Sequence, residues 1–178
     1  MRVKAADKRV YVPLTLSGLA EAYRTGELGA GLFPAYGVTP ALREWYLPED
    51  VEEAEHAEEL EYAALGRAAL ASLRLLAADA GAPRRRVVVA VDVPDRAVSA
   101  DPAGLGELRV DGPVRLDRAA AVHVDAADAE PDVTSAAQAL PAADSGDNGA
   151  QSVVDRAEDH ELLWYATQEI PNLLEPTV

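Results

Sequence analysis

Alternating apolar and polar positions over residues 9–16 predict a first β-strand. Ser17 stands where a helix N-cap belongs, and the apolar stripe behind it predicts a helix that ends in the glycines after residue 25. A second strand is expected over residues 33–38. Thr39 and Pro40 then supply an N-cap followed by proline at the first helical position, which predicts a short helix through Tyr46.

The remaining pattern predicts a long helix over residues 49–80 and, over 86–93, a strand buried on both faces, because its apolar run is continuous. Residues 94–113 are rich in proline and glycine and predict a loop, broken by a short strand at 108–110. A strand over 119–124, a helix over 131–140, a polar loop over 144–149 and a long C-terminal helix over 150–170 complete the prediction.

This order of elements favours an α/β or α+β fold, with a single mixed sheet of about four strands packed against helices. Crossover helices favour a parallel arrangement of the first strands. We expect residues 1–8 to form a disordered N-terminal extension. Residues 9–178 are expected to form one domain, with a mobile loop at 94–113.

Composition narrows the class of protein. The chain has 178 residues, a net charge of −15 and a hydrophobic content of 49%, enough for a packed core. It has no cysteine, which excludes disulfides, thiolate metal sites and cysteine nucleophiles. So acidic a chain repels phosphate backbones, and we expect no direct contact with nucleic acid.

No apolar run is long enough to cross a membrane. Basic residues precede the apolar stretch at 10–20, as in a signal peptide, but Pro13 and Gly18 interrupt that stretch and its alternation is that of a strand. We therefore expect a cytoplasmic protein that does not bind membranes.

If the first strands were parallel, polar residues after them would gather at one sheet edge, where open α/β folds bind ligands. Hydroxyls at helix N-termini, with an arginine beside them, could hold a phosphate or carboxylate. A structural capping role explains the same hydroxyls. The anion-binding candidates are Thr15, Ser17, Thr39 and Arg43, with Asp92 as a candidate acid or base.

The segment from Glu49 to Glu61 holds eight carboxylates in thirteen positions. Glu53 and His56 form a Glu-x-x-His pair, which di-iron bundles use, but no second copy occurs. A solvated acidic face is the simpler interpretation. Repulsion between these charges would also favour a cationic partner, for which Glu52, Glu55 and Glu59 are the candidate contacts.

His160 shares a helical arc with Ala157 and Trp164, so it is a candidate general base or a packed boundary residue. His123 lies on a predicted strand. No Gly-x-Ser-x-Gly elbow and no phosphate-binding glycine loop occurs. The aromatic pair Trp45 and Tyr46 either packs in the core or, if exposed beside the acidic segment, contacts a partner.

Several motifs together carry a resemblance: Tyr-Val-Pro-Leu-Thr at 11–15, Val-Thr-Pro at 38–40, Arg-Glu-Trp-Tyr at 43–46, Glu-Leu-Glu-Tyr-Ala-Ala at 59–64 and Glu-Asp-His-Glu-Leu-Leu-Trp-Tyr at 158–165. The chain resembles an uncharacterised family of small actinobacterial proteins over nearly its whole length. The resemblance implies a single intracellular domain and brings no activity, cofactor or catalytic residue.

These observations leave functions of different classes open. The leading hypothesis is a non-enzymatic acidic protein that binds or regulates a partner through a basic protein surface. The alternative is a small enzyme or ligand-binding domain that takes an anionic metabolite at the sheet edge. A carboxylate metal site is a third hypothesis. No cofactor is indicated, and the sequence does not choose among the three.

Overall fold

The computed structural model describes residues 7–175. The strands in this range are β1 (Asp7–Leu14), β2 (Glu27–Leu28), β3 (Leu32–Tyr36), β4 (Val87–Pro94), β5 (Val98–Ala100), β6 (Glu107–Asp111), β7 (Val114–Arg115), β8 (Ala119–Val124) and β9 (Leu163–Tyr165). The α-helices are α1 (Leu16–Thr25), α2 (Pro40–Tyr46), α3 (Ala57–Ala78), α4 (Glu130–Asp144), α5 (Asn148–Glu158) and α6 (Ile170–Leu174).

The centre of the fold is a mixed α+β arrangement around a seven-stranded sheet in the order β5-β6-β3-β1-β4-β8-β9. Every pair of neighbours in this sheet is antiparallel. A small second sheet pairs β2 with β7. The prediction of about four strands with the first ones parallel is therefore wrong.

The antiparallel arrangement follows from the connections. A single crossover helix returns the chain parallel to the strand it left, but here two elements separate β1 from β3, namely α1 and β2. Likewise α4 and α5 separate β8 from β9, whereas β3 and β4 run in the same direction on either side of β1. Each additional reversal lets the chain re-enter the sheet in the opposite direction.

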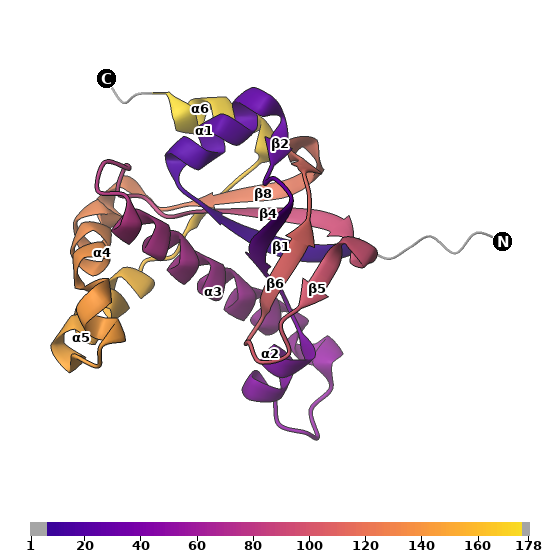
Figure 1. Ribbon diagram of the computed structural model, residues 1–178. Helices are drawn as coiled ribbons and strands as arrows, with labels where there is room; N and C mark the ends of the chain where they lie inside the picture. Colours follow the sequence, from indigo (N-terminus) through magenta and orange to yellow (C-terminus); the bar gives the residue numbers. More distant parts are fainter. Residues whose placement is uncertain (1–6, 176–178) are drawn as a thin grey trace.

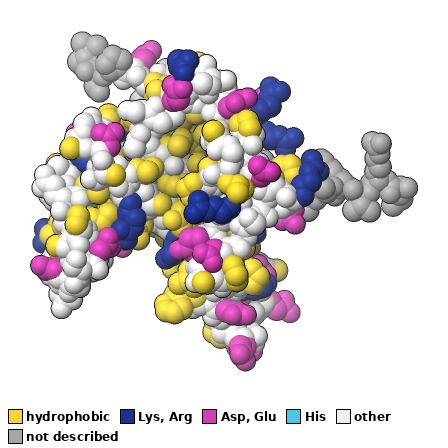
Figure 2. Space-filling view, viewed as in Figure 1, with side chains coloured by type: hydrophobic (Ala, Val, Ile, Leu, Met, Phe, Trp, Pro, Cys, Tyr) yellow, Lys and Arg dark blue, Asp and Glu magenta, His cyan; other side chains and the backbone are white. Residues whose placement is uncertain are grey.

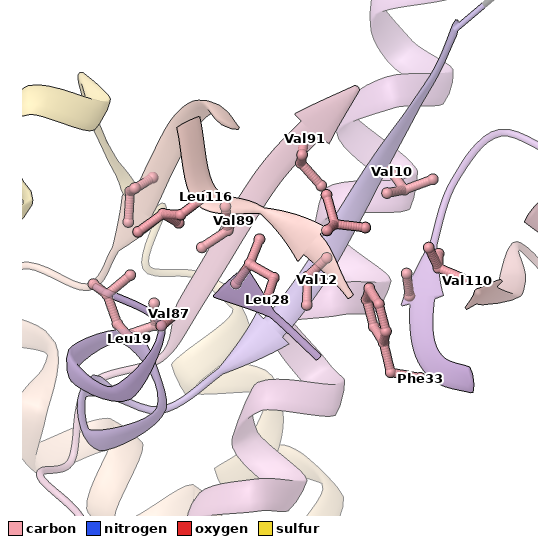
Figure 3. Close-up of a cluster of buried hydrophobic side chains, with 14 of the residues drawn as sticks. Val10, Val12, Leu19, Leu28, Phe33, Val87, Val89, Val91, Val110 and Leu116 are labelled. Carbon is pink, nitrogen blue, oxygen red and sulfur yellow. The ribbon is translucent and has the colours of Figure 1, made fainter. Parts of the chain in front are cut away.

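Helices cover both faces of the sheet (Figure 1). One face packs against α1, α6 and the small β2–β7 sheet, and its core contains Val10 and Val12 of β1 together with the odd-numbered valines of β4. Figure 3 shows these side chains converging with Leu19 and Leu28. On the opposite face, Tyr11, Val88 and Ala90 pack against α3. Strand β4 is thus buried on both faces, which confirms the prediction from its apolar run.

Helix α3 is held to the sheet by a buried hydroxyl. The Ser72 hydroxyl donates to the Leu14 carbonyl at 2.7 Å and accepts from the Val87 amide at 3.0 Å. Ser72 has no exposed surface, and from this buried position it satisfies one main-chain group at the end of β1 and one at the start of β4. The helices α4 and α5 lie next to α3 and share a further apolar cluster with Leu73 and Leu76 of that helix (Figure 1).

Helix starts differ in part from the prediction. Thr39 caps α2, its side chain accepting from the Leu42 amide at 3.2 Å, with Pro40 at the first helical position as predicted. The cap of α1 is Thr15, whose hydroxyl accepts from the Gly18 amide at 3.0 Å, and the predicted cap Ser17 lies inside the first turn. The first strand also starts earlier, at Asp7, so Asp7 and Lys8 belong to the sheet; residues 1–6 of the predicted extension lie outside the described residues.

The predicted helix over residues 49–80 begins only at Ala57, after a short 3₁₀ turn at Glu53–His56. Five carboxylates crowd residues 49–56, and repulsion between them at helical spacing disfavours an α-helix there. The region predicted as a loop at 94–113 contains β5 and β6, which pair with each other, and β6 includes the predicted strand at 108–110.

The predicted C-terminal helix over 150–170 is correct only as far as Glu158. Helix α5 ends at Glu158, and the chain then extends into β9, the edge strand beside β8. Among residues 7–175, no helix has the length and apolar character needed to cross a lipid bilayer.

Candidate functional site

A groove of about 890 Å³ lies between α3 and residues 158–162, which are the last residue of α5 and the segment that links this helix to β9. The first wall is the outward face of α3 with the C-terminal end of α2. The second wall is the 158–162 segment, which we call the linker wall. The base of the groove includes Leu65, Ala69, Leu70 and Leu162.

The first wall owes its polarity to the register of α3. Leu60, Ala64 and Ala68 lie on one face of α3, which is buried against the sheet. Positions on the other side of the helix therefore point outward. These outward positions carry Glu58, Glu59 and Tyr62, of which Tyr62 is 61% exposed. Tyr46, at the end of α2, adds a second exposed ring to the same groove.

A buried ion pair fixes the linker wall. The Arg86 guanidinium, just before β4, donates to both carboxylate oxygens of Asp125 at 2.8 and 2.9 Å. Asp125 also accepts from the Arg86 amide at 2.8 Å. The same guanidinium donates to the His160 carbonyl at 3.0 Å. Because both side chains are at least 97% buried, this arginine is a rigid anchor for the middle of the linker wall.

The His160 side chain supplies a second anchor. Its Nε2 lies 2.8 Å from a carboxylate oxygen of Asp132 in the first turn of α4. His160 thus attaches the linker wall at two points: its carbonyl binds Arg86, just before β4, and its ring binds Asp132 of α4. Because a carboxylate only accepts, this hydrogen bond forms when Nε2 carries the ring proton and donates it to Asp132.

The groove carries a negative charge that its own cations do not neutralise. Arg86 is paired with Asp125, and Arg67 with Glu107 at 2.6 Å. Burial by itself raises the pKa of Glu107, but hydrogen bonds from Arg67 and the main chain outweigh this and lower it. Both arginines are therefore occupied by carboxylates outside the groove lining.

The carboxylates that line the groove are less satisfied. Within residues 7–175, the side chains of Glu58 and Glu158 form no hydrogen bond or ion pair. Glu161 accepts only a long hydrogen bond, 3.4 Å, from the Tyr62 hydroxyl across the groove. Partial burial raises the pKa of Glu158, and the nearby carboxylate of Asp155 raises it further. The groove therefore has unmet capacity for a cation beside two exposed tyrosine rings.

Residues 8–174 match the model of a family of unknown function, DUF6912. The chain belongs to this family. No curated protein and no solved structure shows significant similarity to it. Membership of DUF6912 agrees with the resemblance to an uncharacterised family and assigns no activity.

The predicted anion site does not assemble in this DUF6912 protein. Thr15 follows the end of β1 and Thr39 follows β3, and because these strands are antiparallel the two hydroxyls lie at opposite ends of the sheet. Both hydroxyls cap helices, and Ser17 lies beside Thr15. Arg43 donates to Glu53 at 2.5 Å. The predicted convergence is wrong, since it required parallel strands.

The two candidate acid–base residues are also far apart. Asp92, near the end of β4, accepts two hydrogen bonds from Arg9, and this arginine lowers the pKa of its carboxyl. His160 is tied to Arg86, just before the start of the same strand. Six residues of extended strand separate these positions by roughly 20 Å, so Asp92 and His160 cannot share one substrate atom.

The candidate metal ligands Glu53 and His56 have separate partners. Glu53 is paired with Arg43, and the Nδ1 atom of His56 lies 3.0 Å from Glu59. In the described part of the chain, no group of three or more potential ligands is positioned to hold a metal ion. The Glu-x-x-His hypothesis thus has no ligand set in residues 7–175.

The candidate partner contacts fall into two groups. Glu59 and Tyr46 line the groove. Trp45, which is 71% exposed, and the exposed Glu52 and Glu55 lie outside it on α2 and the turn after it. Figure 2 shows acidic and hydrophobic side chains side by side at the lower end of the molecule, where α2 and this turn lie.

The groove also contains residues that were not among the predicted site residues, namely Tyr62, Glu158, Glu161 and Leu162. All four residues belong to two motifs that are visible in the sequence, at residues 59–64 and 158–165. In the structure these motifs face each other across the groove, with Tyr62 bonded to Glu161. Nothing in their local spacing indicated that they meet.

Proposed function

We propose that this protein is a binding protein that takes a basic segment of a protein partner into the groove between α3 and the linker wall. The observation that carries the proposal is the set of unpaired carboxylates beside exposed tyrosine rings, in a groove whose two arginines are already paired. An arginine or lysine side chain complements each part of this lining.

The charged head group would have two kinds of contact. Glu58, Glu158 and Glu161 offer carboxylate oxygens to a guanidinium or ammonium group. The exposed rings of Tyr46 and Tyr62 offer cation–π contacts, which are worth about 0.5–1 kcal/mol each at exposed sites. Partial desolvation of Glu158 favours a partner that brings a positive charge to it.

The base of the groove suits the rest of such a side chain. Leu65, Leu70 and Leu162 present apolar surface, against which the aliphatic stem of arginine or lysine packs. The linker wall is fixed by Arg86 and Asp132 before any ligand arrives, so binding orders little of the protein itself. The net charge of −15 would accelerate the approach of a basic partner.

The test is the affinity of a fluorescent peptide of alternating arginine and serine, measured by anisotropy at low salt. We expect the Glu158→Gln/Glu161→Gln variant to bind it roughly fivefold more weakly, since exposed charge contacts are worth up to about 1 kcal/mol. The matched control is Glu27→Gln/Asp111→Asn, which removes the same charge from exposed positions outside the groove. Equal weakening by both variants would show nonspecific attraction and contradict the proposal.

An actinobacterial origin, a cytoplasmic location and the lack of direct contact with nucleic acid or membranes stay predictions. Each is compatible with a protein-binding role. The function proposed for the groove does not depend on any of these three predictions.

A further inference from the structure

A second hollow of about 510 Å³ lies beside the groove, over the sheet face that α3 leaves uncovered. Its lining includes Glu58, Tyr62 and Leu65, which also line the groove, so the two hollows meet along this side of α3. Ala90 and Ala121, on neighbouring strands β4 and β8, form part of its floor. Their small side chains leave room above the sheet, and we call this hollow the sheet recess.

Three aromatic rings line the sheet recess. Tyr11 is almost fully buried and lies beside the two alanines in the same row of the sheet. Tyr62 on α3 and Trp164 on β9 are 61% and 62% exposed and stand on different elements at its rim. A small hollow lined by several rings favours a compact cation, because the faces of aromatic π-systems attract positive charge.

The charges of the sheet recess also favour a cation. Glu58 and Glu61 line it, and Glu61 uses one oxygen to accept from the Tyr11 hydroxyl at 2.8 Å. The guanidinium of Arg9 is neutralised by Asp92, to which it donates at 2.6 and 3.1 Å. Burial, together with the charge of Arg9, lowers the pKa of His123, so this imidazole is neutral at pH 7 and adds no opposing charge.

We propose that the sheet recess binds a quaternary or methylated ammonium group. Such a group is compact and cannot donate strong hydrogen bonds when fully methylated, so aromatic faces and a nearby carboxylate are its preferred surroundings. The recess supplies these through Tyr11, Tyr62, Trp164 and Glu61. The inference stands on the sheet recess alone and does not require that the groove bind a basic segment.

The test uses Trp164 as its own reporter. The chain has two tryptophans, and Trp45→Phe removes the other one, which is exposed on α2 and does not line the recess. We expect choline to change the fluorescence of this variant saturably. The neutral isostere 3,3-dimethyl-1-butanol, with carbon in place of the charged nitrogen, should produce no saturable change. Equal responses to both compounds, or no response to choline, would overturn the proposal.

Two further variants in the Trp45→Phe background locate the site. Glu61→Gln keeps an acceptor for Tyr11 but removes the charge, and we expect choline to bind about fivefold more weakly. Glu59→Gln removes a charge that lines the groove but not the recess, and it should change the choline affinity less than about twofold. If Glu59→Gln had the larger effect, choline would be bound in the groove, and the assignment to the sheet recess would be wrong.

Free choline and a methylated lysine side chain carry the same group. A peptide with trimethyllysine among arginines would reach the sheet recess and the groove together, so tighter binding than its unmodified form would identify a protein source. Equal binding of both peptides, with choline still bound, would identify a free small molecule. If the protein bound choline but not the arginine peptide, only the function proposed for the groove would be rejected. If it bound the arginine peptide but not choline, only the ammonium site in the sheet recess would be rejected.

Discussion

Arg86 and Asp125 form a buried ion pair between the start of β4 and the residue after β8, with the guanidinium donating to both carboxylate oxygens. The pair has a second consequence, because Arg86 also holds the His160 carbonyl and thereby positions one wall of the groove. Stability and the shape of the groove thus depend on the same side chain.

Removing Asp125 should therefore strongly destabilise the protein. Asp125→Ala leaves the Arg86 charge buried without a partner, which costs about 3–5 kcal/mol of unfolding free energy. Asp117→Ala is the control, because it breaks the exposed pair with Arg115 and should cost less than about 1 kcal/mol. Urea unfolding measures both. A loss for Asp125→Ala as small as that of the control would contradict the role of the pair.

Ser72→Ala should also destabilise the protein, although it removes a single atom. It leaves the Leu14 carbonyl and the Val87 amide without their buried partner, at a cost of about 2–4 kcal/mol for the two groups together. Ser152→Ala removes an exposed hydroxyl bonded to the Asn148 carbonyl within α5 and should change the stability by less than about 0.5 kcal/mol. Thermal unfolding of both variants at one pH tests this difference.

Glu158→Gln should slightly stabilise the protein at pH 7 while it weakens binding of a basic ligand. Burial, with Asp155 nearby, raises the folded-state pKa of Glu158 above its usual value of 4.5, so the folded state disfavours the charged form. The penalty is absent well below the usual pKa, grows as the pH rises past it, and is complete once the pH exceeds the folded-state pKa. The gain on removing it should be within about 0.5 kcal/mol.

Thermal midpoints at pH 4 and pH 7 check the sign of this effect. Wild-type and variant proteins should differ less at pH 4 than at pH 7. A variant that is less stable than the wild type at pH 7 would show that the Glu158 carboxylate is favourably placed in the free protein.

The sequence predicted the elements whose determinants are local. The continuous apolar run of β4 predicted a strand buried on both faces, and Thr39 with Pro40 predicted the start of α2. Strand direction was predicted wrongly, because it depends on how many elements reverse the chain between two strands. The end of α5 was also missed. Leu163 fits a helical stripe with Ala166 and Ile170, but its pairing with Val124 of β8 prevails over that local pattern.

The candidate site was harder to predict than the fold because its parts are distant along the chain. Tyr62 and Glu161 are 99 positions apart and meet across the groove. Their juxtaposition depends on Arg86, which holds the linker wall from a third part of the sequence. The hydroxyls chosen for an anion site were correctly located near helix starts, but antiparallel strands separated them.

Hydrogen–deuterium exchange with and without the arginine–serine peptide is the most direct test of where a basic segment binds. The groove predicts slower exchange in two separate stretches, the start of α3 around residues 58–66 and the linker wall at residues 158–162, with little change in β5 and β6. Protection confined to the acidic turn at residues 49–56, or spread evenly over the acidic surface, would contradict a binding site in the groove.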